Sequence, residues 1–369
     1  MCLQPILIKN PNYGHDKSPI YRSQSWKYDC TSKYVYVPCG HCSQCIAVKQ
    51  MYLVQRVQME SLNTFMFFST LTYDNKHLPR LTTSTGFDIP FADIRHLQLM
   101  CKRLRVHNSF GRPFRYFAVS ERGSSPTGSG RPHFHILWFF PRYDGELYSD
   151  GLSLNRKYSD IIRDAWCINK GSDKKPIYEP LFEYHEKFYR GKLYKNYDTH
   201  FVAPTLVCDG ITSLAFYVSK YLLKPNDKER KLQQAFRLNL PEDEYEDSWN
   251  LVKSRSFRSS SFGYGFDGRN YYEILSHLHE GVMRSDRTLG YPCYYCPETG
   301  SSFPLSPFYK DNPLVFDERE FIEFKMETPV IYNPELDFTK MTESAKKFER
   351  VRSLVDSKDL SLNFDFLFD

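Results

Sequence analysis

Long apolar runs are missing from this chain of 369 residues. No stretch approaches the roughly 20 apolar residues that a membrane-spanning helix needs. The segment that begins at Met1 also lacks a charged region followed by an apolar stretch, which a secretory signal would carry. We therefore expect a soluble, unsecreted protein without a membrane partner.

A strong net charge is missing as well, since the whole chain carries only +5. The charge is unevenly distributed: residues 311–369 hold 14 acidic side chains against 8 Lys and Arg, so they carry −6 and residues 1–310 carry +11. A basic body with an acidic tail fits a nucleic-acid partner for the body, although a solvated surface alone gives the same composition.

Cysteine is too sparse for a disulfide scaffold, with ten residues spread over the chain. We expect reduced thiols, some of them bound to metal. Cys39, Cys42 and Cys45 have the spacing of a metal knuckle, in which successive thiolates point at one ion, and the expected ion is a structural Zn²⁺. The alternative is a set of reduced, partly buried thiols. A fourth ligand has to come from elsewhere, and the nearby candidates are Cys30, Cys2 and His41.

Aromatic residues are abundant, with 27 Tyr and 29 Phe. They favour β-rich packing and also supply rings on which bases could stack. The length suggests about two domains or one large domain with appendages. We expect a Cys-rich N-terminal segment at residues 1–50, a main domain at residues 51–270 and an accessory region with an acidic tail at residues 271–369.

Residues 131–140 are predicted to form a strand with two different faces. Side chains alternate along a strand, so His133 and His135 point one way while Phe134, Ile136 and Trp138 point the other way into a core. Two imidazoles fixed side by side suit a divalent metal. A half-exposed histidine pair that binds nothing is the alternative.

A second strand is predicted at residues 114–121, and a flexible link joins it to the histidine strand. The two strands would form a long-looped hairpin, which lays Glu121 near the base of the histidine strand. Its carboxylate could complete a three-ligand site. An exposed glutamate at the rim of the sheet is equally consistent with the sequence.

The remaining periodic segments indicate the α+β class. We expect an antiparallel sheet of about five strands, with the histidine strand in the centre and helices mostly on one face. The supporting patterns are helices at residues 47–62, 92–106, 158–167 and 211–223, and a strand at residues 65–73.

The helix expected at residues 211–223 carries two tyrosines. Tyr217 and Tyr221 are four residues apart, so both phenols project from the same side, with Lys220 between them and Lys224 beyond. Such pairs are usually packing residues. A catalytic pair is the alternative.

Residues 253–265 mix cations, hydroxyls and glycines, as a phosphate-contacting segment does. A flexible surface loop has the same composition. Arg255 and Arg258 of this segment, together with Arg131 and Lys224, are the candidate DNA contacts.

Four motifs in this order resemble the HUH endonuclease superfamily, and more closely the replication initiator of the gokushovirus group of microviruses, which are small single-stranded DNA phages. The resemblance spans about residues 35–270. The motifs are Pro38-Cys39-Gly40-His41-Cys42-Ser43-Gln44-Cys45, Ser69-Thr70-Leu71-Thr72-Tyr73-Asp74, Arg131-Pro132-His133-Phe134-His135-Ile136-Leu137 and Tyr217-Val218-Ser219-Lys220-Tyr221.

The resemblance implies the fold and the chemistry of a rolling-circle replication initiator. The fold would be the ferredoxin-like or RRM-like HUH sheet. His133 and His135, with Glu121, would hold Mg²⁺ or Mn²⁺. Tyr217 or Tyr221, helped by Lys220, would attack the DNA backbone and form a 5′-phosphotyrosyl link. The implied partners are a single-stranded DNA origin and the host replication helicase and polymerase, and the implied location is the host bacterial cytoplasm.

Two other functions fit parts of the same pattern. A relaxase or transposase of the same superfamily would use similar chemistry on another DNA. A zinc-containing nucleic-acid-binding protein on a ferredoxin-like sheet would cut no bond, and its tyrosines would be packed aromatics.

Overall fold

A computed structural model describes residues 4–10, 13–14, 32–40, 42–122, 131–172, 174–182, 184–189, 192–197, 201–206, 214–215, 217–219, 227–266, 269–284, 293–296, 301–317 and 319–320. The chain divides into two compact units. One is Val57–Phe266, and the other joins Met1–Arg56 with Asp267–Asp369. The three-part division expected from the sequence, at residues 1–50, 51–270 and 271–369, stays a prediction.

The unit Val57–Phe266 is built on a five-stranded sheet with the strand order β12-β3-β7-β6-β13. Every neighbouring pair is antiparallel, and β7 has a partner on both sides. The strands are β3 (Thr64–Leu71), β6 (Arg115–Arg122), β7 (Pro132–Pro141), β12 (Phe201–Leu206) and β13 (Arg255–Arg258). The predicted mixture of helices and antiparallel sheet is therefore confirmed, while the assignment to the HUH fold stays a prediction.

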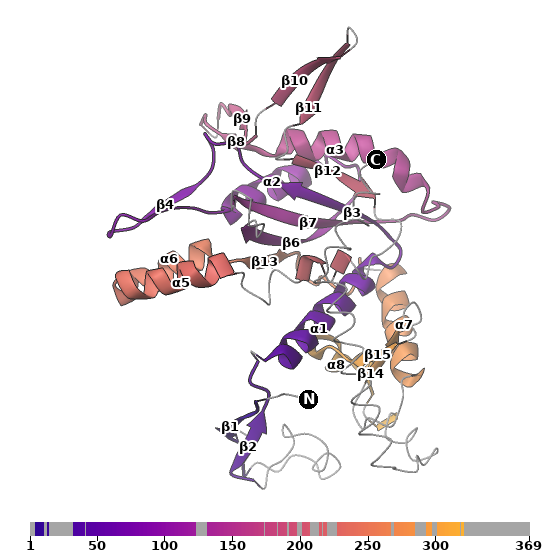
Figure 1. Cartoon of the computed structure of the whole chain (residues 1–369). Helices are drawn as coiled ribbons and strands as arrows, with labels where there is room; N and C mark the ends of the chain where they lie inside the picture. Colours follow the sequence, from indigo (N-terminus) through magenta and orange to yellow (C-terminus); the bar gives the residue numbers. More distant parts are fainter. Residues whose placement is uncertain are drawn as a thin grey trace. The chain divides into compact units, whose positions relative to one another are not determined.

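One face of this sheet packs on two helices, α2 (Ile94–Val106) and α3 (Asp150–Ala165), which lie on the same side of the sheet in Figure 1. Phe134, Ile136 and Trp138 of β7 are fully buried in this core, as the alternation of the strand predicts. The indole N–H of Trp138 donates to Oγ of Ser69 at 2.8 Å, so its polar atom is satisfied within the core. The core therefore fixes β7 from behind.

The helix boundaries follow local chemistry. The side chain of Asp93 accepts the backbone N–H of Arg95, so α2 begins at Ile94, two residues after the expected start. The prediction was less accurate for α3, which begins at Asp150 rather than at residue 158. Polar residues fill the first half of α3, where only part of one face is buried, and this weakens the apolar period.

The opposite face of the sheet divides into an apolar end and a polar end. At the apolar end, the ring of Phe262 stacks on Phe117 of β6 with centroids 5.4 Å apart and contacts Phe139 of β7 at 5.7 Å. The turn that carries Phe262 is held by Glu60, whose buried carboxylate accepts the backbone N–H groups of Gly263 and Gly265 at 2.8 and 2.9 Å. This covering leaves His133, His135 and Glu121 at the other end.

Residues 253–265 therefore do not form a flexible loop. Arg255–Arg258 pair with β6 as the edge strand β13, which the sequence did not predict. Its charged residues alternate with one buried-face aromatic, Phe257, and four residues of such composition do not read as a strand.

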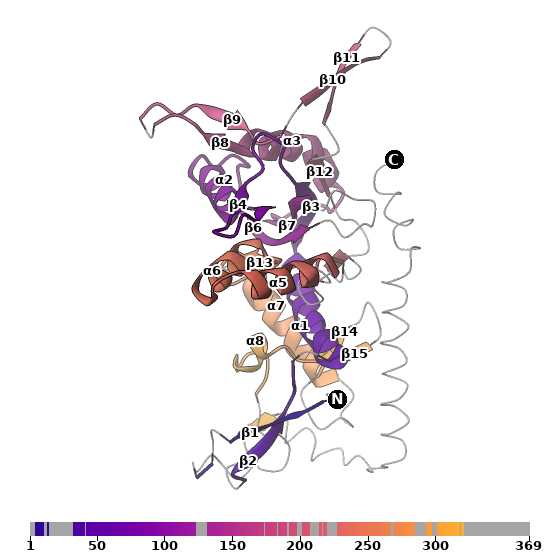
Figure 2. The ribbon, with the colours of Figure 1, turned by 60° about the vertical axis from the view of Figure 1, so that its left-hand side comes forward.

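Short hairpins and a helix pair complete this unit. Figure 2 shows α5 (Asp227–Asn239) and α6 (Glu242–Val252) side by side, and Phe236, Leu240 and Val252 form their buried contact. The hairpins are β4 (Arg80–Thr82) with β5 (Asp88–Pro90), β8 (Cys167–Asn169) with β9 (Tyr178–Pro180), and β10 (Tyr184–Tyr189) with β11 (Lys192–Tyr197).

The other unit combines elements from the two ends of the chain. The helix α1 (Ser43–Ser61) begins four residues before the expected start and runs across the boundary between the units. In this unit, Oε1 of Gln55 accepts the backbone N–H of Ser306 at 2.9 Å. Its further elements are β1 (Ile6–Lys9), β2 (Tyr34–Val37), α7 (Arg269–Arg284), β14 (Cys293–Cys296), β15 (Ser301–Pro304) and α8 (Pro307–Lys310).

Among the helices in the described part of the chain, none combines the length and the apolar character that crossing a membrane requires.

Candidate metal centre

Two neighbouring strands bring three candidate ligands together. The β6–β7 register sets Glu121 directly opposite His133, and His135 follows two residues later on the same face. Nε2 of His135 lies 3.0 Å from Oε2 of Glu121 and 3.1 Å from Nε2 of His133. Nε2 of His133 lies 3.5 Å from the same carboxylate oxygen. These side chains form one of two groups among the described residues that could hold a metal ion.

The sequence left open whether Glu121 lies exposed at the rim. Its exposed fraction is 4%, so the rim alternative is wrong. His135 is 6% exposed, which also removes the alternative of a half-exposed histidine for this residue. The three groups therefore meet away from bulk water.

The outer nitrogens of both imidazoles have oxygen partners. Nδ1 of His133 lies 2.9 Å from the carbonyl oxygen of Arg131, which can only accept, so this nitrogen carries the hydrogen. Nδ1 of His135 lies 2.9 Å from Oγ1 of Thr70, the residue directly opposite on β3. When Nδ1 of both neutral rings donates outward, both Nε2 lone pairs converge on a carboxylate. A cation stabilises such an arrangement.

The pKa values in the cluster are shifted by burial and by mutual contact. Burial raises the pKa of Glu121, but the hydrogen bonds from His133 and His135 outweigh it and hold the value below the ordinary one. Burial lowers the pKa of His135, and Glu121 offsets this only in part. For His133, burial acts in the same direction, but the hydrogen bond and charge of Glu121 raise the pKa overall. The carboxylate is therefore held in its charged form.

Tyr217 lies beside this cluster. Residues 214–215 and 217–219 are helical, and Leu214, Ala215 and Val218 are buried as the predicted apolar stripe. The ring centroid of Tyr217 is 5.5 Å from that of His135, and its edge also meets Phe68 at 6.4 Å. The structure thus brings one predicted tyrosine to the predicted histidines, although they are more than 80 positions apart in the sequence.

Several predicted site residues lie outside the described residues. They are Lys220, Tyr221 and Lys224 of the tyrosine segment, and Cys30 of the N-terminal segment. Their roles stay predictions of the sequence.

The other candidate DNA contacts have different surroundings. The guanidinium of Arg131 donates to the backbone oxygen of Tyr73 and to the side chain of Asn75, so it holds the end of β3. Arg255 lies over the ring of Phe257 at 5.6 Å, and burial lowers its pKa. Arg258 is exposed on β13. DNA binding by these residues stays a prediction.

Two residues of the site were not singled out from the sequence. Thr70 contacts His135 as described above, and the ring of Phe68 stacks on the other side of the same imidazole with centroids 5.6 Å apart. Alternation along β3 puts Phe68 and Thr70 on one face. Only the β3–β7 register, which the sequence does not contain, shows that this face meets His135.

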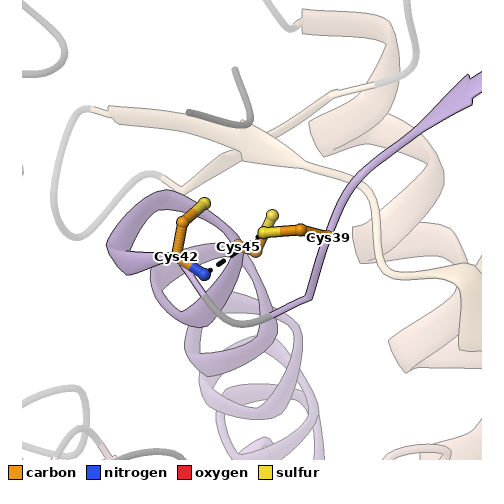
Figure 3. A group of neighbouring side chains, drawn as sticks. All are labelled: Cys39, Cys42 and Cys45. Carbon is orange, nitrogen blue, oxygen red and sulfur yellow. Dashed lines mark hydrogen bonds between the residues drawn. The ribbon is translucent and has the colours of Figure 1, made fainter. Parts of the chain in front are cut away.

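Cys39, Cys42 and Cys45 form the second group that could hold a metal ion. Figure 3 shows the three side chains at the start of α1. Cys39 and Cys45 are buried, and Cys42 is partly buried. The predicted cysteine-rich segment is thus present.

The comparisons with known proteins agree with the resemblance seen in the sequence. Residues 66–226 match a family model described as a replication-associated protein of the ORF2 type. No curated protein and no solved structure matches the chain. The matched segment contains Glu121, His133, His135 and Tyr217. The likeness to a rolling-circle replication initiator is thereby confirmed at the level of this family, while the gokushovirus type stays a prediction. Over residues 66–226, the chain carries the sequence pattern of this replication-associated protein family.

Proposed function

We propose that the protein is a metal-dependent endonuclease that starts rolling-circle replication by nicking a single-stranded DNA origin through a tyrosine. The observation that carries this proposal is the position of Tyr217, whose ring lies 5.5 Å from the ring of His135 within the segment that matches the replication-associated family. A nucleophile and a cation site side by side are what phosphodiester transesterification needs.

The donor set fits Mg²⁺ or Mn²⁺. Glu121 provides a carboxylate oxygen, His133 and His135 provide two imidazole nitrogens, and these ligand atoms converge within hydrogen-bonding distances. Two histidines and one carboxylate leave further positions open for other ligands, and Mn²⁺ accepts both oxygen and nitrogen donors. The bound ion would polarise the scissile phosphate and offset its growing charge.

Tyr217 is the proposed nucleophile. Its phenolic oxygen would form a bond to phosphorus while the bond from phosphorus to the 3′ oxygen breaks. The phenol loses its proton, and the leaving 3′ oxygen gains one. The products are a 5′-phosphotyrosyl link and a free 3′-hydroxyl that a host polymerase could extend. Because the link is still a phosphodiester, a second strand end can reverse it without ATP.

The sequence supports a second nucleophile. Tyr221 follows Tyr217 by one helical turn, and Lys220 lies between them. We assign Tyr221 to the cut at the regenerated origin and Lys220 to the charge of the phosphate. Arg131, Lys224, Arg255 and Arg258 are the proposed DNA contacts, since cations at a strand's path supply most of the affinity for the backbone.

The five-stranded antiparallel sheet with the ligand strand in the middle supports the HUH endonuclease fold. The biological setting that goes with it is a phage-type replication cycle in the host bacterial cytoplasm, with the host helicase and polymerase as partners.

The test is covalent capture of DNA. The full chain would be incubated with Mn²⁺ and a pool of single-stranded oligonucleotides that have a randomised centre and a label at one end. A 5′-phosphotyrosyl link leaves the 3′-labelled fragment on the denatured protein and releases the 5′-labelled fragment. Sequencing the captured fragments would then give the preferred site.

The alternatives predict other results. DNA that is bound but fully released by denaturant would contradict an endonuclease and indicate a nucleic-acid-binding protein. Capture of the 5′-labelled fragment would contradict the proposed polarity. A relaxase or transposase would give the same link, and it would be distinguished by the captured sequence.

A further inference from the structure

Three cysteines converge where β2 leads into α1. Cys39 follows the end of β2 by two residues, Cys42 stands directly before the first residue of α1, and Cys45 lies in its first turn. One ligand atom from each of the three lies within 4.8 Å of the others. Figure 3 shows the thiols of Cys39 and Cys45 close together and Cys42 on the adjoining helical turn.

The backbone between the cysteines is shaped as a tight knuckle. Gly40 adopts φ +79°, a conformation that residues with a side chain rarely adopt. This turn directs the backbone N–H of Cys42 at the sulfur of Cys39, with a nitrogen to sulfur distance of 3.3 Å. An N–H group aimed at sulfur stabilises a negatively charged sulfur more than a neutral one.

Two further features place positive charge at the same point. The thiols lie at the N-terminus of α1, a helix of 19 residues, where the helix dipole favours negative charge. Nζ of Lys49, one turn further along, donates to the carbonyl oxygen of Gly40 at 3.0 Å and so braces the knuckle. The knuckle is therefore suited to hold several thiolates.

We propose that Cys39, Cys42 and Cys45 bind one thiophilic divalent ion of the Zn²⁺ class as thiolates and form a structural site at the junction of β2 and α1. Sulfur is a soft donor that selects Zn²⁺ over Mg²⁺ or Mn²⁺, so this site is chemically distinct from the one at Glu121, His133 and His135. Binding forms three metal–sulfur bonds and releases the thiol protons to solvent. A fourth ligand from outside the described residues would close the tetrahedron, and Cys30 is the candidate from the sequence.

A structural ion would cross-link two elements that otherwise share little. The hairpin of β1 and β2 exposes Ile6, Leu7 and Tyr36, so burial of apolar surface stabilises it little. The ion would tie the end of this hairpin to the first turn of α1. Zinc at this point does not require DNA cleavage, so the two proposals can fail separately.

The test uses the full chain with His133→Ala and His135→Ala, which removes the other site. The reduced protein is loaded with Zn²⁺ or with Co²⁺, whose near-ultraviolet charge-transfer absorption reports thiolate ligands. We expect about one Zn²⁺ per chain after dialysis, and a Co²⁺ spectrum with thiolate absorption that Zn²⁺ abolishes by displacement. Less than about a tenth of an equivalent of zinc, or no thiolate absorption, would overturn the proposal.

Substitutions identify the ligands. Cys42→Ser and Cys45→Ser are expected to lose the thiolate absorption and the retained zinc, while Cys167→Ser is expected to keep both. Cys167 is a suitable control because it is a buried cysteine whose thiol contacts the carbonyl oxygen of Ala165, in the other unit. Equal zinc retention in all three variants would overturn the assignment.

A measurement on the unsubstituted ligand cysteines covers the case in which these variants fail to fold. A mercurial reagent added stepwise to the zinc-loaded chain should release the ion as the thiols react, and a chromophoric chelator would report the release. Zinc that stays bound after all accessible and buried thiols have reacted would contradict thiolate ligation.

Discussion

The hydroxyl of Thr70 on β3 and Nδ1 of His135 on β7 lie 2.9 Å apart, across a directly opposed pair of the sheet. Because Nδ1 is occupied by this contact, Nε2 is the nitrogen that faces His133 and Glu121. Thr70 is therefore a positioning residue for a metal ligand, and it acts without touching the ion itself.

Thr70→Val should weaken Mn²⁺ binding by about 10- to 100-fold, which is the usual effect of removing a partner of a metal-binding histidine. Valine keeps the shape and removes only the hydroxyl. Thr70→Ser should restore affinity, and titration calorimetry with Mn²⁺ would measure both. Thr64→Val is the matched control, because the hydroxyl of Thr64 bonds to the end of α1 and not to the site. Wild-type Mn²⁺ affinity in Thr70→Val would contradict the positioning role.

His133→Ala combined with His135→Ala should abolish divalent-dependent nicking, and chelation by EDTA should have the same effect on the unchanged protein. The reason is that two of the three proposed ligands are lost together. His107→Ala serves as the control, since His107 is exposed beyond the end of α2. Cleavage at the normal rate in the double variant would remove the metal from the mechanism.

Tyr217→Phe and Tyr221→Phe should each block the complete cycle of cutting and rejoining, and the double variant should form no covalent adduct. Phenylalanine keeps the ring contacts of Tyr217 with His135 and Phe68 while it removes the nucleophilic oxygen. Denaturing electrophoresis of the captured 3′-labelled strand gives the result. Tyr272→Phe, an exposed tyrosine on α7, should behave as wild type. DNA trapped on the double variant would show that another residue attacks.

Phe134→Ala should lower the free energy of unfolding by about 3–5 kcal/mol. The side chain is fully buried between the two histidines, on the core face of the strand, and its removal leaves a cavity directly behind the metal centre. Leu99→Ala on the exposed side of α2 should change stability by no more than about 0.5 kcal/mol. Urea unfolding measures both. A loss for Phe134→Ala as small as that of the control would mean that the core does not support the histidine strand.

The ion pair of Arg112 and Glu146 should give a pH-dependent contribution to stability. Nη2 of Arg112 lies 2.8 Å from Oε1 of Glu146, and hydrogen bonding by Arg112 lowers the pKa of this carboxyl from its ordinary value. A lowered folded-state pKa stabilises the protein above the ordinary pKa, and this contribution is lost as the pH falls through the folded-state pKa. Glu146→Gln should therefore be less stable than wild type near neutral pH, and the difference should vanish in acid. A difference that grows as the pH falls would contradict the pairing.

The histidine strand could be predicted because its pattern is local. His133 and His135 alternate with Phe134, Ile136 and Trp138 within one strand, and alternation alone decides the two faces. The helix α2 was predictable for the same reason, because Leu97, Met100 and Leu104 recur at helical spacing and all are buried.

Features that depend on pairing were beyond the sequence. Nothing local in Arg255–Arg258 marks a strand, and only its partner β6 makes it one. The contact of Thr70 with His135 likewise depends on the register between two strands that are far apart in the chain, because a shift of one residue would turn Thr70 to the other face. The grouping of Met1–Arg56 with Asp267–Asp369 joins the two ends of the chain and leaves no local pattern.

The central position of β7 also sets how long the ligands keep their arrangement. With β3 on one side and β6 on the other, the backbone amides of the histidine strand are bonded within the sheet along its length. Such amides exchange with solvent only when the sheet itself opens. Amide exchange measured by mass spectrometry should therefore be slowest around His133 and His135, so local fraying would not disassemble the ligand pair before the domain unfolds.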